Sequence, residues 1–232
     1  AQPVTAGILE QLIFSKPYFD PAGLIVALEN NVPVGFAHAG FGPNEEEAAV
    51  SCETGTTYQL MLRAEHRKRS LAGELLACSE SYLRERGAKV IYAGGIRPLN
   101  AFYLGLYGGS ELPGILAGDA VFVEACHNAG YREIDRVNVM LLDLPSFRLP
   151  IARTLRQLRR EVSCQETLMP PPPTWWEGCT IGAFERVHFF LARPHGGAAL
   201  ADVWFWDLEP LSSSWGAAAA GMFDLYVPAD QR

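Results

Sequence analysis

The sequence has little of what marks several large classes of protein. It contains no apolar run near the roughly 20 residues that a membrane-spanning helix needs, and its start lacks the charged, apolar and small-residue regions of a signal peptide. Nineteen Lys and Arg residues stand against 26 Asp and Glu residues, a net charge of −7, so an overall basic field for nucleic acid is missing. These absences predict a soluble, cytoplasmic protein whose partners include neither a membrane nor a nucleic acid.

Cysteine and histidine are too scattered to form a familiar framework. The five cysteines are odd in number and far apart, unlike the close pairs of a zinc site or the even set of a disulfide scaffold. The five histidines also show no ligand spacing. We therefore expect free thiols and no metal.

Hydrophobic residues are abundant: they make up 49% of the 232 residues, and charged residues make up 19%. This composition is typical of a folded globular protein with a sizeable core. The length is long for one domain and short for two. Strand patterns alternate with helix patterns along the chain, which predicts an α/β fold.

Residues 1–146 are predicted to form one unit. Its expected elements are a short helix near 8–13, strands at 24–29, 32–41, 56–62, 90–93 and 137–144, and helices at 71–86 and 119–128. Asn30 and Asn31 tolerate the left-handed backbone of a tight hairpin turn. Residues 42–55 are expected to be an acidic loop. The helix at 71–86 is a crossover, so we expect the strands on either side of it to be parallel.

The character of the sequence changes after Leu144. Residues 147–173 are predicted to be a linker with a basic helix, a strand and the stiff segment Pro170–Pro173. Trp175 and Trp176 follow, and paired tryptophans commonly seal a domain interface.

Residues 174–232 are predicted to repeat the front half of the first unit. A second hairpin is expected at 187–207, and residues 225–232 align with 60–67 with three identical residues of eight, a Leu, an Ala and an Arg. The second copy would stop before its own crossover helix. We expect the native chain to continue into that helix and its strands; if it ends at Arg232, either a partner chain, as in a homodimer, completes the second sheet or the repeat is wrong.

A basic turn precedes the helix expected at 71–86. Its residues are Arg67, Lys68, Arg69, Ser70, Leu71 and Ala72. Unpaired amides at the start of a helix attract anions, and small residues let a phosphate approach the backbone, so this turn suits a diphosphate. The alternative is an ordinary helix start with Ser70 as its N-cap and solvated basic side chains.

At this turn the sequence resembles the GCN5-related N-acetyltransferases, the GNAT family. The family's pyrophosphate loop has the pattern R/Q-x-x-G-x-G/A between a strand and a helix; Arg67, Ser70 and Ala72 occupy its three specified positions, with serine replacing the middle glycine. A later family motif, a helix ending in Gly-Phe or Gly-Tyr, matches residues 119–131. The resemblance spans residues 24–144. It implies a mixed, mostly antiparallel sheet flanked by helices, followed here by a partial second copy.

The resemblance also implies a reaction, the transfer of an acetyl group from acetyl-CoA to a primary amine of a small molecule or peptide. The pyrophosphate would lie on residues 67–72, and free backbone groups near Met61 and Leu62 would hold the acetyl carbonyl. Asn100 is assigned to the same ligand.

A proton donor for the leaving thiolate is the remaining requirement. The family often has a tyrosine four residues before its Gly-Phe pair, and this chain has Cys126 there. An aromatic insertion before that helix supplies Tyr103 and Tyr107, and Asn100 and Tyr107 keep the family's Asn-to-Tyr spacing. The candidate catalytic residues are therefore Tyr107, Tyr103 and Cys126.

Two other functions stay open at this point. The serine in the loop, the cysteine at the tyrosine position and the incomplete second copy favour a degenerate, non-catalytic module for binding or assembly. Tandem folds of this kind also transfer other acyl groups, such as an aminoacyl unit.

Overall fold

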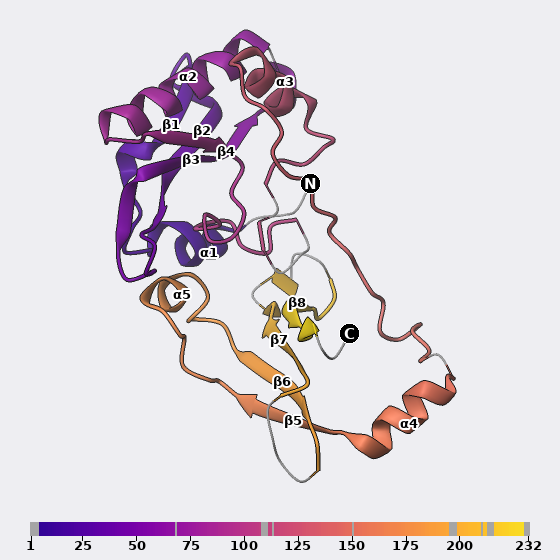
Figure 1. Cartoon of the computed structure of the whole chain (residues 1–232). Helices are drawn as coiled ribbons and strands as arrows, with labels where there is room; N and C mark the ends of the chain where they lie inside the picture. The colour runs from indigo at the N-terminus through magenta and orange to yellow at the C-terminus, as the bar shows by residue number, and fades with distance from the viewer. Residues whose placement is uncertain are drawn as a thin grey trace.

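The computed structural model describes residues 5–67, 69–107, 111–112, 114–149, 151–194, 199–209, 211–212 and 216–229. Two four-stranded sheets, with strand orders β1-β2-β3-β4 and β5-β6-β7-β8, organise the chain. Figure 1 shows helices α2 and α3 over the first sheet and the second sheet at the opposite end of the molecule.

The first sheet is mixed and mostly antiparallel. Its strands are β1 (Leu24–Glu29), β2 (Val32–Pro43), β3 (Val50–Leu62) and β4 (Val90–Ala93). β1–β2 and β2–β3 are antiparallel, whereas β3–β4 is parallel. Helix α2 (Arg69–Glu85) makes the crossover between β3 and β4, as expected. The predicted fold class, a mixed and mostly antiparallel sheet flanked by helices, is confirmed.

The first hairpin turns where the sequence predicts. Asn30 and Asn31 have φ values of 51° and 64°, the left-handed backbone that asparagine tolerates better than other side chains. Before the hairpin, α1 (Ala6–Leu9), the π-helical turn η1 (Glu10–Phe14) and the 3-10 turn η2 (Pro21–Gly23) lead into the sheet.

The acidic loop expected at 42–55 is wrong for most of its length. Gly42 pairs with Ser51 and Pro43 with Val50, so β2 and β3 extend through the region. The short connection is closed by Asn44, whose Oδ1 accepts hydrogen bonds from the N–H groups of Ala48 and Ala49 at 2.9 and 3.0 Å. Exposed strand ends carry polar residues on both faces, which resembles a loop in sequence.

One face of the first sheet packs against two helices. Leu75 and Leu76 of α2 and Phe122 and Cys126 of α3 (Ala120–Asn128) are buried against Leu60. Further along α2, Leu83 packs on Gly55. A Cβ atom added at Gly55 would lie only 2.8 Å from Leu83 Cδ2, so the contact requires glycine. This layer fixes the direction of α2 and hence the position of its first turn.

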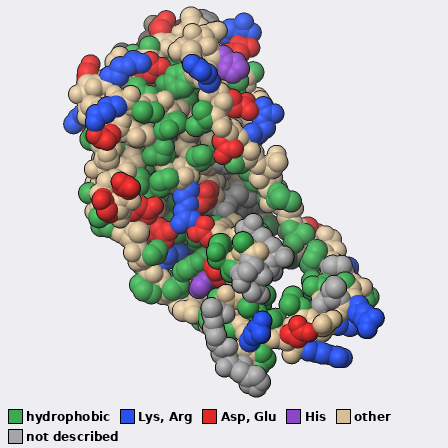
Figure 2. Space-filling model, viewed as in Figure 1, with side chains coloured by type: hydrophobic (Ala, Val, Ile, Leu, Met, Phe, Trp, Pro, Cys, Tyr) green, Lys and Arg blue, Asp and Glu red, His purple; other side chains and the backbone are tan. Residues whose placement is uncertain are grey.

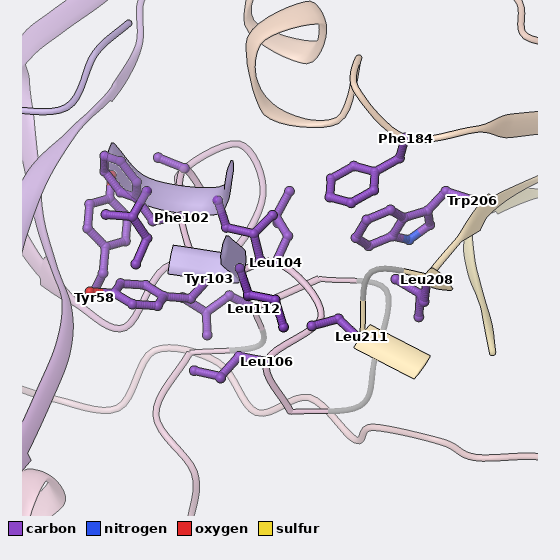
Figure 3. Packing of buried hydrophobic residues seen from close by; sticks show 14 of the residues in the cluster. Tyr58, Phe102, Tyr103, Leu104, Leu106, Leu112, Phe184, Trp206, Leu208 and Leu211 are labelled. Carbon is purple, nitrogen blue, oxygen red and sulfur yellow. The ribbon is translucent and has the colours of Figure 1, made fainter. Parts of the chain in front are cut away.

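The other face shares its core with the second half of the chain. The cluster contains Tyr58, residues 101–104 and Leu106, together with Phe184, Trp206 and Leu208 (Figure 3). Trp176 belongs to it and is 2% exposed, whereas Trp175 is 43% exposed. Trp176 therefore packs in this shared core, and a domain interface sealed by the tryptophan pair stays a prediction.

The second half forms an antiparallel sheet. Its elements are α4 (Arg153–Glu161), β5 (Ser163–Leu168), α5 (Trp175–Thr180), β6 (Arg186–Ala192), β7 (Ala201–Asp207) and β8 (Ala220–Tyr226). β6–β8 follow α5 in the order in which β1–β3 follow α1. The partial repeat stays a prediction, as do the boundaries at residues 146 and 173.

The strand expected at 137–144 is wrong. Residues 132–143 have no regular structure, and Met140 and Leu141 are 89% and 80% exposed. A groove is lined by β4 on one side and by residues 131–139 on the other, and none of the described strands pairs with residues 137–144. Figure 1 shows this part of the chain running from α3 to α4.

Within the described residues, no helix combines the length and the hydrophobicity that a membrane span requires.

Candidate functional site

The site is built on the second half of β3. β4 pairs with β3 only through Thr54–Thr57. A bulge follows at once, since Ala39 pairs with Thr57 but His38 pairs with Gln59, which leaves Tyr58 as an extra residue. Beyond the bulge β3 continues to Leu62 with only β2 beside it among the described strands.

The direction of the backbone amides along this edge follows from one hydrogen bond. The Arg63 N–H donates to the Val34 carbonyl at 2.9 Å, toward β2. Amides alternate along an antiparallel strand, so Met61 also faces β2, while Leu60 and Leu62 direct their amides to the unpaired edge. Of the two residues predicted to hold the carbonyl, the geometry favours Leu62. Leu60 was not predicted, but the same alternation of amides along β3 directs its N–H to the unpaired edge as well.

The basic turn connects this edge to α2. The 3-10 turn η3 (Ala64–His66) is tied to the end of β1 by His66 Nε2, 3.0 Å from Glu29 Oε2. Arg63 and Arg67 are exposed and have no ion pair within the described chain. Arg69 differs, because its Nε and Nη2 contact the Glu124 carboxylate of α3 at 2.5 and 3.0 Å. The unmatched positive charge therefore lies on Arg63 and Arg67.

The rest of the predicted turn is placed as follows. α2 begins at Arg69, so Ser70 lies exposed inside the first turn and not at the N-cap position that the alternative interpretation gave it. Leu71 is half-buried and Ala72 is fully buried, which keeps the backbone of the turn close to the sheet. Lys68 lies outside the described residues.

Tyr107 and Tyr103 contact β3 and β2 across the sheet face opposite α2. Tyr107 Oη lies 3.0 Å from Gln59 Nε2 and 3.2 Å from Gln59 Oε1. Tyr103 Oη lies 2.9 Å from His38 Nδ1. Because His38 and Gln59 are cross-strand partners, the structure brings both predicted tyrosines to the bulge where the unpaired edge begins. Gln59 and His38 carried no signal in the sequence.

Burial strengthens the ordinary preference of these phenols for the protonated form. It raises the pKa of Tyr107 and of Tyr103 above the usual range, because the phenolate is poorly solvated there. Both side chains therefore keep their protons at neutral pH. Tyr103 is buried and engaged with His38, whereas Tyr107 is only partly buried, so Tyr107 is the better placed donor.

Cys126 lies on the opposite side of the sheet. It is 5% exposed among residues of α2 and α3, and burial raises its pKa to about 12. A protonated thiol in an apolar cluster is packing material. The structure does not bring Cys126 together with the tyrosines.

Asn100 lies in the segment after β4, at a small cavity between the two halves of the chain. Elsewhere in the described part of the molecule, no three His, Cys, Asp or Glu side chains gather to hold a metal ion, and all five cysteines are free.

Comparison with known proteins gives a family match over part of the chain. A similar solved structure is an aminoglycoside N-acetyltransferase, AAC(6')-Iy, in complex with CoA: identity is 16%, the alignment covers 51% of this chain and 73% of that chain, and the TM-score is 0.34. No curated protein matches the sequence. Residues 7–108, which hold β1–β4, the basic turn and both tyrosines, match the acetyltransferase (GNAT) family model.

Proposed function

We propose that the protein moves an acetyl group from acetyl-CoA to a primary amine of a small molecule or peptide. The observation that carries this proposal is the unpaired edge of β3 beyond Thr57, which leads directly into a basic turn and the start of a helix of 17 residues. The family match over residues 7–108 covers the same elements.

The turn suits the diphosphate of acetyl-CoA. The first N–H groups of α2 have no intrahelical acceptor, and the helix dipole places partial positive charge beside them. Arg63 and Arg67 are exposed there without carboxylate partners in the described chain. An anion at this position would gain both backbone hydrogen bonds and two charged side chains.

The edge of β3 suits the rest of the donor. The pantetheine arm of acetyl-CoA contains amide groups, and an extended chain with amide groups pairs well with a free strand edge. The Leu60 and Leu62 N–H groups point to that edge and would donate to a carbonyl oxygen on which negative charge develops. This polarisation uses backbone alone.

The chemical step needs one proton delivered and one removed. A neutral amine attacks the acetyl carbon, the C–N bond forms and the C–S bond breaks. We assign Tyr107 as the donor of the proton that the departing thiolate accepts. The base that accepts the amine's proton is not assigned. Glu53, on the exposed part of β3, is paired with Lys89, which lowers its pKa and makes it a weak base.

Calorimetric titration with acetyl-CoA tests the proposal, followed by an acceptor screen with free thiol as the readout. Saturable binding and thiol release with an amine are expected. No binding at millimolar acetyl-CoA would contradict the proposal in favour of a non-catalytic module. Binding of acetyl-CoA without transfer to any amine would point to a different acyl group.

Arg67→Ala is expected to weaken acetyl-CoA binding about tenfold, because it removes one charge-assisted contact with the diphosphate. The matched control is Arg84→Ala at the other end of α2, where Arg84 pairs with Glu80 at 2.9 Å. Calorimetry at two salt concentrations measures both. An unchanged Kd for Arg67→Ala would mean that the diphosphate lies elsewhere.

A further inference from the structure

Helix α4 lies apart from the rest of the molecule. Every side chain of this helix that the structure describes is exposed, and Figure 1 shows α4 at a distance from both sheets. A helix of nine residues is marginal in water by itself, because so few turns hardly offset the cost of nucleation. The helix therefore needs a surface to pack on, and the described part of its own chain does not supply one.

The sequence of α4 gives it two different faces. Leu155 and Leu158 are exposed and share one face, and Ile151 and Val162 continue the same spacing just outside the helix. The rest of its surface is basic, and its arginines have no ion pair within the described chain. They are Arg153, Arg156, Arg159 and Arg160. Figure 2 shows basic side chains gathered in this part of the molecule, next to hydrophobic ones.

The second sheet has an apolar face that is open to solvent. The side chains on this open face come from alternate positions of β6 and β7. They are Val187, Phe189, Leu191, Val203 and Phe205, and all of them are partly exposed. The Phe189 and Phe205 rings meet edge to face, with 5.8 Å between centroids. Trp206 points to the other side of the sheet and joins the shared core.

Comparison of the two sheets shows which layer the second one lacks. The first sheet has α2 and α3 on one face and the shared core on the other. The second sheet also contributes to the shared core, but none of the described helices buries its open face. An apolar sheet face is normally covered by a second layer of helix or sheet. A helix with an apolar stripe is therefore the expected occupant.

The connection between α4 and β5 prevents α4 from covering the sheet of its own chain. Only Val162 separates the end of α4 at Glu161 from the start of β5 at Ser163, and its backbone is extended, with φ −130° and ψ 153°. A chain usually needs about two to six residues to reverse between a helix and a strand. The helix of a second copy is not subject to this restriction.

Charge and size also fit a second copy. Residues 162–232 contain eight Asp and Glu residues against three Arg residues, so the half of the chain that holds the open face is acidic where α4 is basic. Glu166 of the edge strand β5 pairs with Phe189 and is exposed beside the open face. A nine-residue helix is about 14 Å long and a seven-residue strand about 23 Å, so the helix fits within the face.

We propose that two copies of the chain form a dimer in which α4 of each copy lies on the open face of the other. Leu155 and Leu158 pack on the Phe189–Phe205 pair, and the arginines of α4 lie among the carboxylates around the face, Glu166 included. The exchange is reciprocal, so one two-fold axis covers both helices and both faces and leaves no surface for a third copy. The dimer does not depend on acetyl transfer.

Sedimentation velocity of the full chain over a wide concentration range tests the dimer. We expect a monomer–dimer equilibrium whose Kd rises severalfold between low and high salt, since opposite charges meet at the interface. A monomer at every concentration and at low salt would overturn the proposal.

Leu158→Asp is expected to raise the Kd of the dimer at least about 100-fold, because each dimer loses the buried leucine twice. Leu158 is exposed in the single chain, so the circular dichroism spectrum of the monomer should be unchanged. Gln157→Asp adds the same charge on the side of α4 away from the leucines and is the matched control, with a Kd close to that of the wild type. Equal Kd values for Leu158→Asp and wild type would overturn the proposal.

Cross-linking identifies which surfaces meet. Leu158→Cys and Val203→Cys are made separately, in chains where the four cysteines that are not buried are replaced by serine, and are then mixed with a short bismaleimide. A cross-linked dimer is expected from the mixture, with little from Leu158→Cys alone. Cross-linking of Leu158→Cys with itself and not with Val203→Cys would mean that the two helices pair with each other, contrary to the proposal.

Flotation with phosphatidylserine vesicles tests the other class of partner that a basic helix with an apolar stripe suits, an anionic lipid surface. The wild-type protein is expected to stay with the soluble fraction, because α4 is already covered in the dimer. Flotation of a monomeric wild-type protein that Leu158→Asp abolishes would assign α4 to a membrane and overturn the dimer.

Discussion

Tyr107→Phe is expected to lower kcat for acetyl transfer about 100-fold and to leave the Kd for acetyl-CoA unchanged. Proton transfer by a positioned side chain contributes roughly 10²- to 10⁴-fold to a rate. Tyr107 has its hydroxyl beside Gln59 at the bulge of β3, and the phenol is protonated at neutral pH because its ordinary pKa is about 10 and burial raises that pKa further. Phenylalanine keeps the ring and removes only the donor.

The measurement is single-turnover thiol release under saturating acetyl-CoA, so that binding and product release do not limit the rate. The other two candidate catalytic residues provide the controls. Cys126→Ala should leave kcat unchanged, since Cys126 lies among α2 and α3 side chains. Tyr103→Phe should affect stability more than rate, since Tyr103 is buried against His38. A Tyr107→Phe enzyme with wild-type kcat would remove Tyr107 from the chemical step.

Local signals in the sequence predict much of the first sheet. The asparagine pair, the short apolar run at 90–93 and the helical spacing before Gly87 each depend on residues close together in the chain, and each was confirmed within a few residues. The parallel pairing of β3 with β4 followed from the crossover helix between them. Such features are decided by backbone geometry and short-range periodicity.

The errors arise where pairing over a distance decides the outcome. The segment 137–144 has the apolar content of a strand, but a strand also needs a neighbour with free backbone groups, and none of the described strands pairs with it. The region 42–55 shows the opposite error. Its polar sequence predicts a loop, but most of it forms paired strand because β2 and β3 continue beyond the core.

The candidate site was only half visible for the same reason. The basic turn is contiguous in sequence, so its composition pointed to it. The contacts between Tyr103 and His38, and between Tyr107 and Gln59, join residues 65 and 48 positions apart, and the cavity at Asn100 needs Trp176 from the second half of the chain. Tyr107 and Cys126 could not be ranked until the structure placed them on opposite faces of the sheet.

A second large effect is expected on stability in mild acid, and it comes from His38. The imidazole is 0% exposed and packs on the Phe102 ring at 4.6 Å between centroids. Its Nδ1 is hydrogen-bonded to Tyr103 Oη, while its Nε2 has no hydrogen-bond partner among the described residues. Burial therefore favours the neutral ring and lowers its pKa from 6.5 to about 4.

The direction of the pH dependence follows from this shift. Between pH 6.5 and 4 the unfolded chain binds a proton at His38 that the folded protein does not, so the free energy of unfolding falls as the pH falls through this window. A difference of about 2.5 pKa units corresponds to about 3 kcal/mol by pH 4. Urea unfolding at pH 7, 6, 5 and 4.5 measures this loss.

His38→Asn isolates the contribution. Asparagine keeps a neutral acceptor near Tyr103 and has no titration in this range, so its stability should decline less steeply between pH 6.5 and 4. Its smaller side chain lowers stability at every pH, and for that reason the slope, rather than the absolute value, is the quantity to compare. His127→Asn, at an exposed position of α3, should keep the wild-type slope. If His38→Asn loses stability with acid as steeply as the wild type, the acid sensitivity originates in other groups and His38 accepts its proton in the folded state.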